Sequence, residues 1–292
     1  MPYALVMDWD LRELRFFVAV ADAGSFTEAA SQLYVSQAAV SRTIAHLEKK
    51  VGDLLLRRVP RGCELTRTGQ QVLPYARRVL AEAARFDEFL SDRHGTLRLG
   101  YAWAALGKHT ARLQRDWAST HEAIDLELVR YDSPTAGLAE GVCDVAVVRI
   151  PVDEKRFESV VVGLEKRMAA YSSDDAQWAR RRQLAMAEIA ERTVVVDLRV
   201  GTTRSQLWGA QTQPIQTIEA PNADAWFDLI AAGRGVGTTS EATAHHHPRP
   251  EITYRPIKDG PRIPVRLIWW RDHRPAGLDD LVSAVTELYA AG

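Results

Sequence analysis

The sequence of 292 residues predicts a protein of mixed α/β class with three parts: an N-terminal winged helix-turn-helix domain, one long helix, and a larger body of two α/β subdomains. Three observations predict this organisation. Apolar residues recur at helical spacing through about the first 50 residues, and two short apolar segments flank a basic turn directly after them. A long helical pattern then ends in the polar segment 92–95. Beyond it, strand-like and helix-like segments alternate, as in α/β domains.

Composition and charge limit the class of protein. Hydrophobic residues make up 46% of the chain and charged residues 26%, as in globular proteins with a sizeable core. The net charge is −1, so a nucleic-acid site has to come from local charge placement. No apolar run approaches the ~20 residues of a membrane helix, and the N-terminus lacks the basic region of a signal peptide. Cys63 and Cys143 lie far apart, so we expect no disulfide and a cytoplasmic protein without membrane partners.

Three helices are predicted in the N-terminal domain. The first ends at Gly24, and Ser25 with Glu28 forms a Ser-x-x-Glu capping box that begins the second. After a short turn, Ser36 caps the third. The expected inward residues are Leu11, Leu14, Phe17, Val18 and Ala21 in the first helix, Phe26, Ala29, Ala30 and Leu33 in the second, and Val40, Ile44 and Leu47 in the third.

The third helix presents side chains suited to the DNA major groove. Two short helices joined by a tight turn form a helix-turn-helix unit, in which the start of the second helix enters the groove. Gln37 can bond an adenine edge through two hydrogen bonds, Ser41 can reach a phosphate or a base edge, and Arg42 suits a phosphate. An ordinary solvated helix face is the alternative. The outward residues are Gln37, Ala38, Ser41, Arg42 and Ala45.

A basic two-stranded wing is predicted after this helix. Leu54–Leu56 is a short apolar strand, segment 57–62 is a turn with arginines, and segment 63–65 leads back. From residue 36 to 78 there are nine Lys or Arg against three acidic residues, a local balance of +6. Phosphate contacts need such a concentration of positive charge. We therefore expect Arg58 and Arg61 to contact DNA.

Residues 11 to about 90 resemble the N-terminal domain of LysR-type transcriptional regulators. The motifs that carry the resemblance are AVADAGSFTEAA, VSQAAVSRTIAHLE, LLLRR and LTRTG. The resemblance implies a recognition helix from Ser36 to about Lys50, with Gln37, Ser41 and Arg42 as DNA contacts and Arg61 in the wing. Many relatives carry Pro after the Gln where this chain has Ala38, which affects the fine sequence preference. The expected DNA-binding residues are Ser36, Gln37, Ala38, Ser41, Arg42, Arg58 and Arg61.

A long helix capped by Thr66 is expected to run to about Arg93, with a local kink at Pro74. Its apolar residues fall near a/d spacing, interrupted by Asp87. The helix either packs on its own domain or pairs two DNA-binding heads, and we favour pairing because little of the domain remains to cover it. LysR-type proteins dimerise through such a helix, which implies a homodimer on a pseudo-palindromic double-stranded operator and, further, a tetramer. The residues are Leu73, Ala76, Leu80, Ala83 and Leu90.

The C-terminal body is expected to contain a mainly parallel sheet. Trp269 and Trp270 are expected to face the core and the surface from one strand. The order of elements and the stretch GRGVGTTSEA resemble LysR-type effector domains, which have two α/β subdomains like those of periplasmic binding proteins. Strands are expected at 96–101, 124–128, 145–148, 167–172, 193–196, 215–218, 236–239 and 265–269, and helices at 110–119, up to 141, within 175–190, between 222 and 233, and at 279–290.

An effector pocket is expected at the carboxyl ends of strands, between the two subdomains. Many relatives have Ser or Thr in the first loop, where this chain has Ala102, Trp103 and Ala104, so the effector is flat or aromatic, or there is none. These residues alternatively only fill the seam between the subdomains. The expected effector-binding residues are Ala102, Trp103, Ala104, Arg149, Thr202, Thr203, Thr238 and Thr239.

Other sequence features give little support for a metal site, a redox function or an enzyme activity. His245, His246 and His247 are consecutive, and consecutive helical side chains do not converge on one metal ion. Cys143 lacks a nearby resolving cysteine for redox sensing. The chain has no phosphate-binding loop, nucleophile elbow or H-E-x-x-H motif, so we expect no cofactor, no metal and no enzyme activity.

We therefore expect a sequence-specific DNA-binding transcription regulator of LysR type that responds to a small-molecule effector. Residues 8–66 would form the DNA-binding domain, 67–94 the dimerisation helix and 95–292 the regulatory domain. Subdomain I would cover about 95–166 and 268–292, and subdomain II about 167–267. Two alternatives remain open: an enzyme with an appended DNA-binding head, and an effector-independent architectural repressor whose body only oligomerises.

Overall fold

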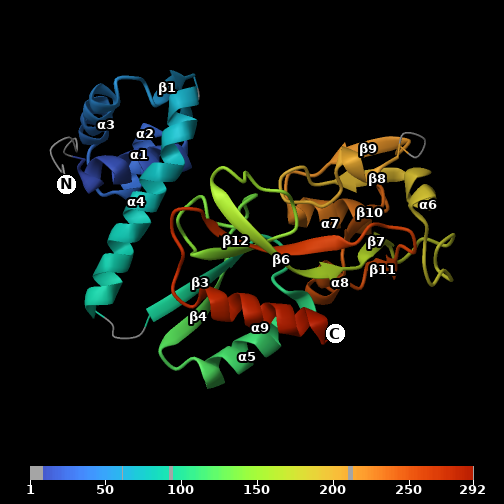
Figure 1. Cartoon of the computed structure of the whole chain (residues 1–292). Helices are drawn as coiled ribbons and strands as arrows, with labels where there is room; N and C mark the ends of the chain where they lie inside the picture. The colour runs from blue at the N-terminus through green and yellow to red at the C-terminus, as the bar shows by residue number, and fades with distance from the viewer. Residues whose placement is uncertain (1–8, 61, 92–94, 210–212, 292) are drawn as a thin grey trace. The chain divides into compact units, whose positions relative to one another are not determined.

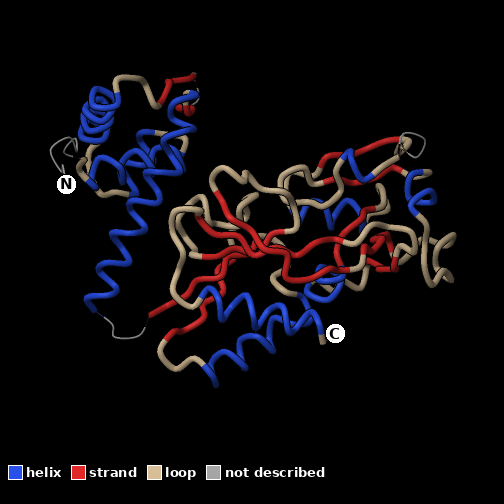
Figure 2. The backbone as a smooth tube through the Cα atoms, in the orientation of Figure 1, coloured by secondary structure: helices blue, strands red, loops and turns tan. Residues whose placement is uncertain are grey.

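The computed structural model describes residues 9–60, 62–91, 95–209 and 213–291 (Figure 1). The chain divides into two compact units at about residue 93. Figure 2 shows that the N-terminal unit is mostly helical and that the C-terminal unit mixes helices and strands. Across the described ranges, no helix combines the length and apolar character that a membrane crossing requires.

The N-terminal unit begins with three short helices whose starts are fixed by side-chain caps. The Oγ of Ser25 accepts a hydrogen bond from the amide of Glu28 at 3.4 Å, and the Oγ of Ser36 accepts one from the amide of Ala39 at 3.2 Å. The predicted caps of the second and third helices are therefore confirmed. The helices are α1 (Leu11–Ala23), α2 (Phe26–Gln32) and α3 (Gln37–Val51), followed by β1 (Leu56–Val59), β2 (Gly62–Leu65) and α4 (Arg67–Ser91).

These helices enclose one apolar core. Phe17 of α1 lies at its centre and is fully buried. Leu11 is exposed, contrary to the prediction, and Phe16 is buried instead, so the inward face of α1 is rotated relative to the expected stripe. The other buried apolar residues of this core include Leu14, Val20, Ala29, Ala30, Val40, Ile44, Leu47 and Leu55.

The wing differs in detail from the prediction. Strands β1 and β2 pair antiparallel, with Leu56 opposite Leu65 and Val59 opposite Gly62. Leu54 is exposed and lies before the strand, whereas the sequence placed it within one. The strand therefore continues through Arg57 and Arg58, and only the turn between residues 59 and 62 forms the tip.

Helix α4 begins where the sequence predicts. The Oγ1 of Thr66 accepts a hydrogen bond from the amide of Gly69 at 2.9 Å, and the helix continues through Pro74. The expectation that α4 has little of its own domain to pack on is wrong for its first half. Ala76 is buried in the core of the unit, and Leu73 and Leu80 pack against that core. A different face of α4 is open, with Tyr75, Val79 and Phe86 exposed.

The first subdomain of the C-terminal unit contains a five-stranded sheet with the order β4-β3-β5-β12-β6. Strand β3 is parallel to β4 and β5, whereas β12 is antiparallel to β5 and β6. Helices α5 and α9 cover one face of this sheet. The elements are β3 (Gly95–Tyr101), α5 (Thr110–Thr120), β4 (Ile124–Arg130), β5 (Val145–Val148), β6 (Phe157–Glu165), β12 (Ile263–Trp270) and α9 (Leu278–Ala290).

The other face of this sheet is covered by turns. Trp269 and Trp270 are each only 7% exposed, so the expectation that one of them faces the surface is wrong. The Nε1 of Trp270 donates a hydrogen bond to the carbonyl of Leu138 at 3.2 Å. The helix expected to end near Gly141 is absent, because the segment around Leu138 forms consecutive turns.

The second subdomain contains a three-stranded sheet, β10-β7-β11, that is antiparallel throughout. The expectation of a mainly parallel sheet is wrong for these three strands, whereas β8 and β9 pair in parallel as a separate two-stranded sheet. Strand β7 leads out of the first subdomain and β11 leads back, so they run in opposite directions. The elements are β7 (Arg167–Ser172), α6 (Met186–Ala190), β8 (Thr193–Val196), β9 (Gln216–Glu219), α7 (Ala223–Ala231), β10 (Gly237–Ser240), α8 (Glu241–His246) and β11 (Ile252–Pro256).

Two short segments connect the subdomains. One is the junction of β6 and β7, at residues 165–167, and the other lies between β11 and β12, at residues 257–262. Strand β12 starts at Ile263, so the expected division at residue 267 falls inside a strand of the first subdomain. The sequence also missed β6, α8 and β11, and of the helices expected within 175–190 only the one-turn α6 forms.

Candidate functional site

The first candidate site is the N-terminal half of α3. Its predicted contact residues Gln37, Ala38 and Arg42 are exposed, Ser41 is partly exposed, and the cap residue Ser36 is also exposed. Figure 1 shows α3 at the edge of the N-terminal unit. The helix start thus offers amide, hydroxyl and guanidinium donors on an open face.

Arg58 of the wing is bound to this helix. Its Nη2 donates a hydrogen bond to the Oγ of Ser41 at 3.3 Å, and its guanidinium lies 5.1 Å from the centre of the Phe26 ring of α2. Arg57 instead points to the neighbouring strand, where it forms an ion pair with Glu64 at 2.6 Å. Arg58 therefore links the wing to α3, and Arg61 lies outside the described residues.

A buried carboxylate holds α3 against α1, and the sequence analysis did not identify it. Glu13 is 5% exposed, accepts a hydrogen bond from the Nζ of Lys50 at 2.9 Å and pairs with the Nδ1 of His46. Burial acts to raise the pKa of Glu13, but the hydrogen bonds from His46 and Lys50 and their charges outweigh it, so the pKa lies below its ordinary value. The signal in the sequence was an acidic residue on the apolar face of α1.

This lowered pKa predicts an acid-sensitive contact between α1 and α3. A carboxylate with a depressed folded-state pKa stabilises the fold above its unfolded pKa of about 4.5, and this stabilisation is lost as the pH falls through the folded value. We expect Glu13→Gln to lower the protection of α1 and α3 amides at pH 7 and to reduce its change between pH 5 and pH 3. Hydrogen exchange with mass spectrometry, corrected for intrinsic rates, measures both, and peptides from α9 serve as the internal control. Equal acid dependence in the variant and the wild type would contradict the assignment.

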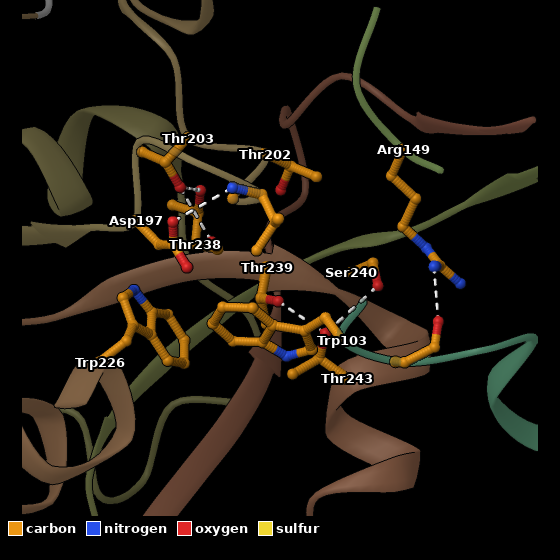
Figure 3. A pocket seen from close by; sticks show the side chains of 13 residues that line it. Trp103, Arg149, Asp197, Thr202, Thr203, Trp226, Thr238, Thr239, Ser240 and Thr243 are labelled. Carbon is orange, nitrogen blue, oxygen red and sulfur yellow. Dashed lines mark hydrogen bonds between the residues drawn. The ribbon is translucent and has the colours of Figure 1, made fainter. Parts of the chain in front are cut away.

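The second candidate site is a pocket in the C-terminal unit, between its two subdomains (Figure 3). Its volume is about 30 Å³, roughly the space of one water molecule in the liquid. Seven of the eight expected residues line it, and Ala102 does not. The lining residues that the sequence analysis missed are Asp197, Val200, Trp226, Ser240 and Thr243.

Trp103 is the reason that the pocket is small. Its ring packs edge-on against Trp226 at 5.4 Å and lies 5.5 Å from Phe227, both on α7 of the second subdomain. The carbonyl of Trp103 is 2.9 Å from the Nε2 of His247. The side chain of Trp103 therefore occupies part of the cleft between the subdomains.

The threonines of the pocket wall are bonded to one another. The hydroxyls of Thr203 and Thr238 lie 2.7 Å apart, and that of Thr239 donates to Thr243 at 2.8 Å. Behind them, the Nη1 of Arg167 lies 3.3 Å from the hydroxyls of Thr202 and Thr238. Burial lowers the pKa of Arg167 to about 10. Within the described part of the chain, Arg167 has no carboxylate at ion-pair distance.

Arg149 lines the pocket, but its guanidinium is engaged elsewhere. It donates two hydrogen bonds to Glu165, at 2.8 and 2.7 Å, and two to the carbonyls of Ala104 and Ala105. The hydroxyl of Tyr289 donates to the same carboxylate at 2.7 Å. Burial acts to raise the pKa of Glu165, but the charge and hydrogen bonds of Arg149 outweigh it, so the pKa is lowered. Arg149 therefore anchors the first loop of the pocket.

The three consecutive histidines and the two cysteines can also be located in the structure. His245 and His246 end α8, and His247 contacts Trp103. Among the residues that the structure describes, no three His, Cys, Asp or Glu side chains are grouped as metal ligands. Cys63 and Cys143 are buried thiols, and burial raises the pKa of Cys63.

Both parts of the chain match profiles of known sequence families. Residues 11–70 match the profile described as "Bacterial regulatory helix-turn-helix protein, lysR family". Residues 91–290 match the profile described as "LysR substrate binding domain". The two matches correspond to the two compact units of the structure.

Known regulators match along most of their length. The chain is 29% identical over 282 residues to the uncharacterized HTH-type transcriptional regulator YnfL of Escherichia coli (strain K12), covering 91% of this chain and 94% of that protein. It is 26% identical over 279 residues to the HTH-type transcriptional regulator BudR of Raoultella terrigena, covering 91% and 96%.

Solved structures have the same fold. The crystal structure of CbnR, a LysR family transcriptional regulator, matches with a TM-score of 0.69 at 23% identity and covers 96% of this chain and 99% of that chain. Full-length CbnR in complex with its target DNA matches with a TM-score of 0.65 at 22% identity, covering 96% and 100%. At this level of identity, the likeness establishes the fold.

Proposed function

The chain belongs to the LysR family of bacterial transcriptional regulators, and we propose that it binds an operator as a homodimer and responds to a small-molecule effector. The relatives are regulators rather than enzymes. The observation that carries the DNA-binding proposal is the open, side-chain-capped start of α3, with Gln37 and Arg42 exposed. We assign residues 8–66 to DNA binding, 67–94 to dimerisation and 95–292 to regulation, in a protein that acts in the cytoplasm.

The exposed residues of α3 have distinct proposed roles. Gln37 lies in the first turn and reads a base edge, and Ala38 permits close approach to a thymine methyl group. Ser41 binds a phosphate or a base edge, Arg42 binds a phosphate, and Ser36 presents the helix start to a phosphate. Arg58 keeps Ser41 in place until DNA docks, and then either group is available to a phosphate. Arg61 at the wing tip completes the proposed set.

Two variants of α3 separate base reading from phosphate binding. Gln37→Ala is expected to weaken operator binding by about 1–3 kcal/mol and to relax the sequence preference at one position in each half-site. Arg42→Ala is expected to weaken binding to all sequences and to reduce the slope of affinity against salt by about 1. Fluorescence anisotropy with the upstream region of the gene, at several salt concentrations, measures both.

The matched control is Arg112→Ala, which removes an exposed arginine from α5 of the other unit. It is expected to leave operator affinity and salt dependence unchanged. Unchanged affinity in both Gln37→Ala and Arg42→Ala would rule out α3 as the recognition helix.

Dimerisation is proposed to use the open face of α4. Tyr75, Val79 and Phe86 are exposed and follow a/d spacing, with steps of four and seven residues. The residues expected at the interface from the sequence, Leu73 and Leu80, pack within the unit instead. A two-fold pair of heads reads two half-sites, which supports a pseudo-palindromic operator, and pairing of dimers would give a tetramer.

The effector is proposed to bind in the pocket lined by Trp103, Ala104, Thr202, Thr203, Thr238 and Thr239, with Arg149 in support. Small-molecule pockets usually measure about 300–1,000 Å³, so an effector has to displace Trp103 or separate the subdomains. A ligand that binds the open state better shifts the population toward it. The small cavity and the packed Trp103 also favour a second candidate, an effector-independent repressor whose C-terminal unit only oligomerises.

A further inference from the structure

Asp197 is a buried carboxylate, and one of its oxygens has no partner among the residues that the structure describes. It follows β8, lines the pocket and is 2% exposed. Its Oδ1 accepts hydrogen bonds from the amides of Arg199 and Val200, at 2.8 and 3.1 Å. Its Oδ2 is also buried but has no hydrogen-bond partner within the described ranges. Burying an unpaired carboxylate oxygen is costly, and native structures rarely leave one without a function.

Within the described residues, no positively charged side chain that lines the pocket forms an ion pair with Asp197. Across the described residues, no lysine, arginine or histidine lies at ion-pair distance from Asp197. Arg149, the cation that lines the pocket, is paired with Glu165. Arg167 lies behind the threonines and donates to their oxygens. A negative group inside the pocket thus faces a space that holds no positive partner.

The other walls of the pocket suit a cation with an adjacent oxygen. Trp103 and Trp226 present indole rings, whose faces attract cations. The Nε1 of Trp226 donates to the carbonyl of Val195 at 2.9 Å, whereas the Nε1 of Trp103 is buried and, within the described chain, without a partner. The pocket therefore offers one unused acceptor, the Oδ2 of Asp197, and one unused donor, the Nε1 of Trp103.

We propose that the effector of this protein is a small organic amine that carries a hydrogen-bond-accepting oxygen close to its ammonium group. The ammonium group donates to the Oδ2 of Asp197, and the oxygen accepts from the Nε1 of Trp103. This inference rests on the proposed effector-responsive function and names the chemistry that its pocket selects. The space of about 30 Å³ suits the ammonium group alone, so the subdomains have to part slightly to admit the remainder of the ligand while both hydrogen bonds are kept.

The loop that carries Asp197 is preorganised for this contact. The two amide hydrogen bonds to Oδ1 fix the carboxylate, and the amide of Gly201 donates to the carbonyl of Asp197 at 3.1 Å. A Cβ at position 201 would lie 2.3 Å from that carbonyl oxygen, so the close return of the loop requires glycine. The carboxylate therefore meets the ligand without a further ordering cost.

Matched probes test the inference on the full-length wild-type protein. 2-Amino-3-phenylpropan-1-ol has an ammonium group and a hydroxyl, 3-phenylpropan-1-ol lacks the amine, and 3-phenylpropionate replaces the cation with an anion. Thermal-shift assays and isothermal titration are expected to show binding of the amino alcohol that is at least 10-fold tighter than binding of the other two. Preference for the carboxylate would overturn the inference and leave the effector-responsive function standing. Binding of none of the three would overturn it in favour of the effector-independent candidate.

The variant Asp197→Asn tests whether the ammonium group of the ligand binds to Asp197. A hydrogen bond to a charged group is strong, so we expect the affinity for the amino alcohol to fall by about 10- to 100-fold. Because the variant removes an unpaired buried charge, its unliganded melting temperature is expected to equal or exceed that of the wild type. The matched control, Asp228→Asn, removes an exposed carboxylate from α7 and is expected to bind the amino alcohol as the wild type does. Unchanged affinity in Asp197→Asn would overturn the assignment, and the comparison of probes on the wild type decides the ligand class if the variant does not fold.

Discussion

Arg149→Met is expected to lower the free energy of unfolding of the C-terminal unit by about 3–5 kcal/mol, because it leaves the Glu165 carboxylate buried and unpaired. The carboxylate is 2% exposed and would keep hydrogen bonds from Tyr289 and Ser240, which supply no positive charge. The carbonyls of Ala104 and Ala105 would lose their donors as well. Urea unfolding followed by tryptophan fluorescence measures the change.

Two control variants isolate the cause of this loss. Arg149→Met combined with Glu165→Leu removes both charges and is expected to recover most of the lost stability, because buried ion pairs replaced by apolar groups are often neutral or stabilising. Arg112→Met breaks an exposed pair with Asp116 and is expected to cost less than about 0.5 kcal/mol. A double variant as unstable as the single one would show that packing, rather than the unpaired charge, explains the effect.

Phe86→Glu is expected to separate the proposed homodimer. The ring is 62% exposed in one chain, and burying it in both partners would contribute about 3–6 kcal/mol in total. Replacing both rings with carboxylates removes this contribution and adds like-charge repulsion. We therefore expect the dimer dissociation constant to rise by about 100-fold or more, and operator affinity to fall because the two heads no longer bind together.

Analytical ultracentrifugation over a range of concentrations measures the dissociation constant. Leu54→Glu is the matched control, since Leu54 is 59% exposed in the same unit but lies outside α4. It is expected to remain a dimer. If Phe86→Glu also remains a dimer with normal operator affinity, the open face of α4 is not the interface.

Local signals in the sequence predicted the helix starts of the N-terminal unit well. Ser25, Ser36 and Thr66 cap their helices as expected, because a cap depends on residues only three positions away. The helix after Asn222 has the same basis, since its side chain accepts from the amide of Ala225. Such features require no knowledge of the tertiary structure.

Features that depend on distant segments could not be predicted in this way. The packing of Leu73 and Leu80 of α4 follows from the position of α1, which the spacing of α4 does not encode. Trp270 is buried because the turns around Leu138 cover it. Both exceptions concern which neighbouring segment covers an apolar residue.

The sequence predicted only part of the pocket, because the rest also depends on contacts between distant segments. Thr202 and Thr238 were identified because ligands lie at strand ends, a rule of topology. Asp197 sits at the end of β8, yet its importance comes from an oxygen that no neighbour satisfies, and only a structure reveals a missing partner. Trp103 was identified by position, but its packing on Trp226 depends on the opposite subdomain.

The junction of β6 and β7 restricts how the cleft can open. Glu165 is fixed to Arg149 and Tyr289 of the first subdomain, and two residues later Arg167 is fixed to the threonines of the second. Lys166 lies between these two anchors, and its amide donates to the Oε2 of Glu241 at 3.1 Å while its carbonyl accepts from the amide of Glu241 at 3.0 Å. Movement of the subdomains would therefore turn about this short junction together with segment 257–262. The length of a ligand in the cleft would then set the angle between the two subdomains. A series of ligands of increasing size would therefore produce an increasing rotation of one subdomain relative to the other.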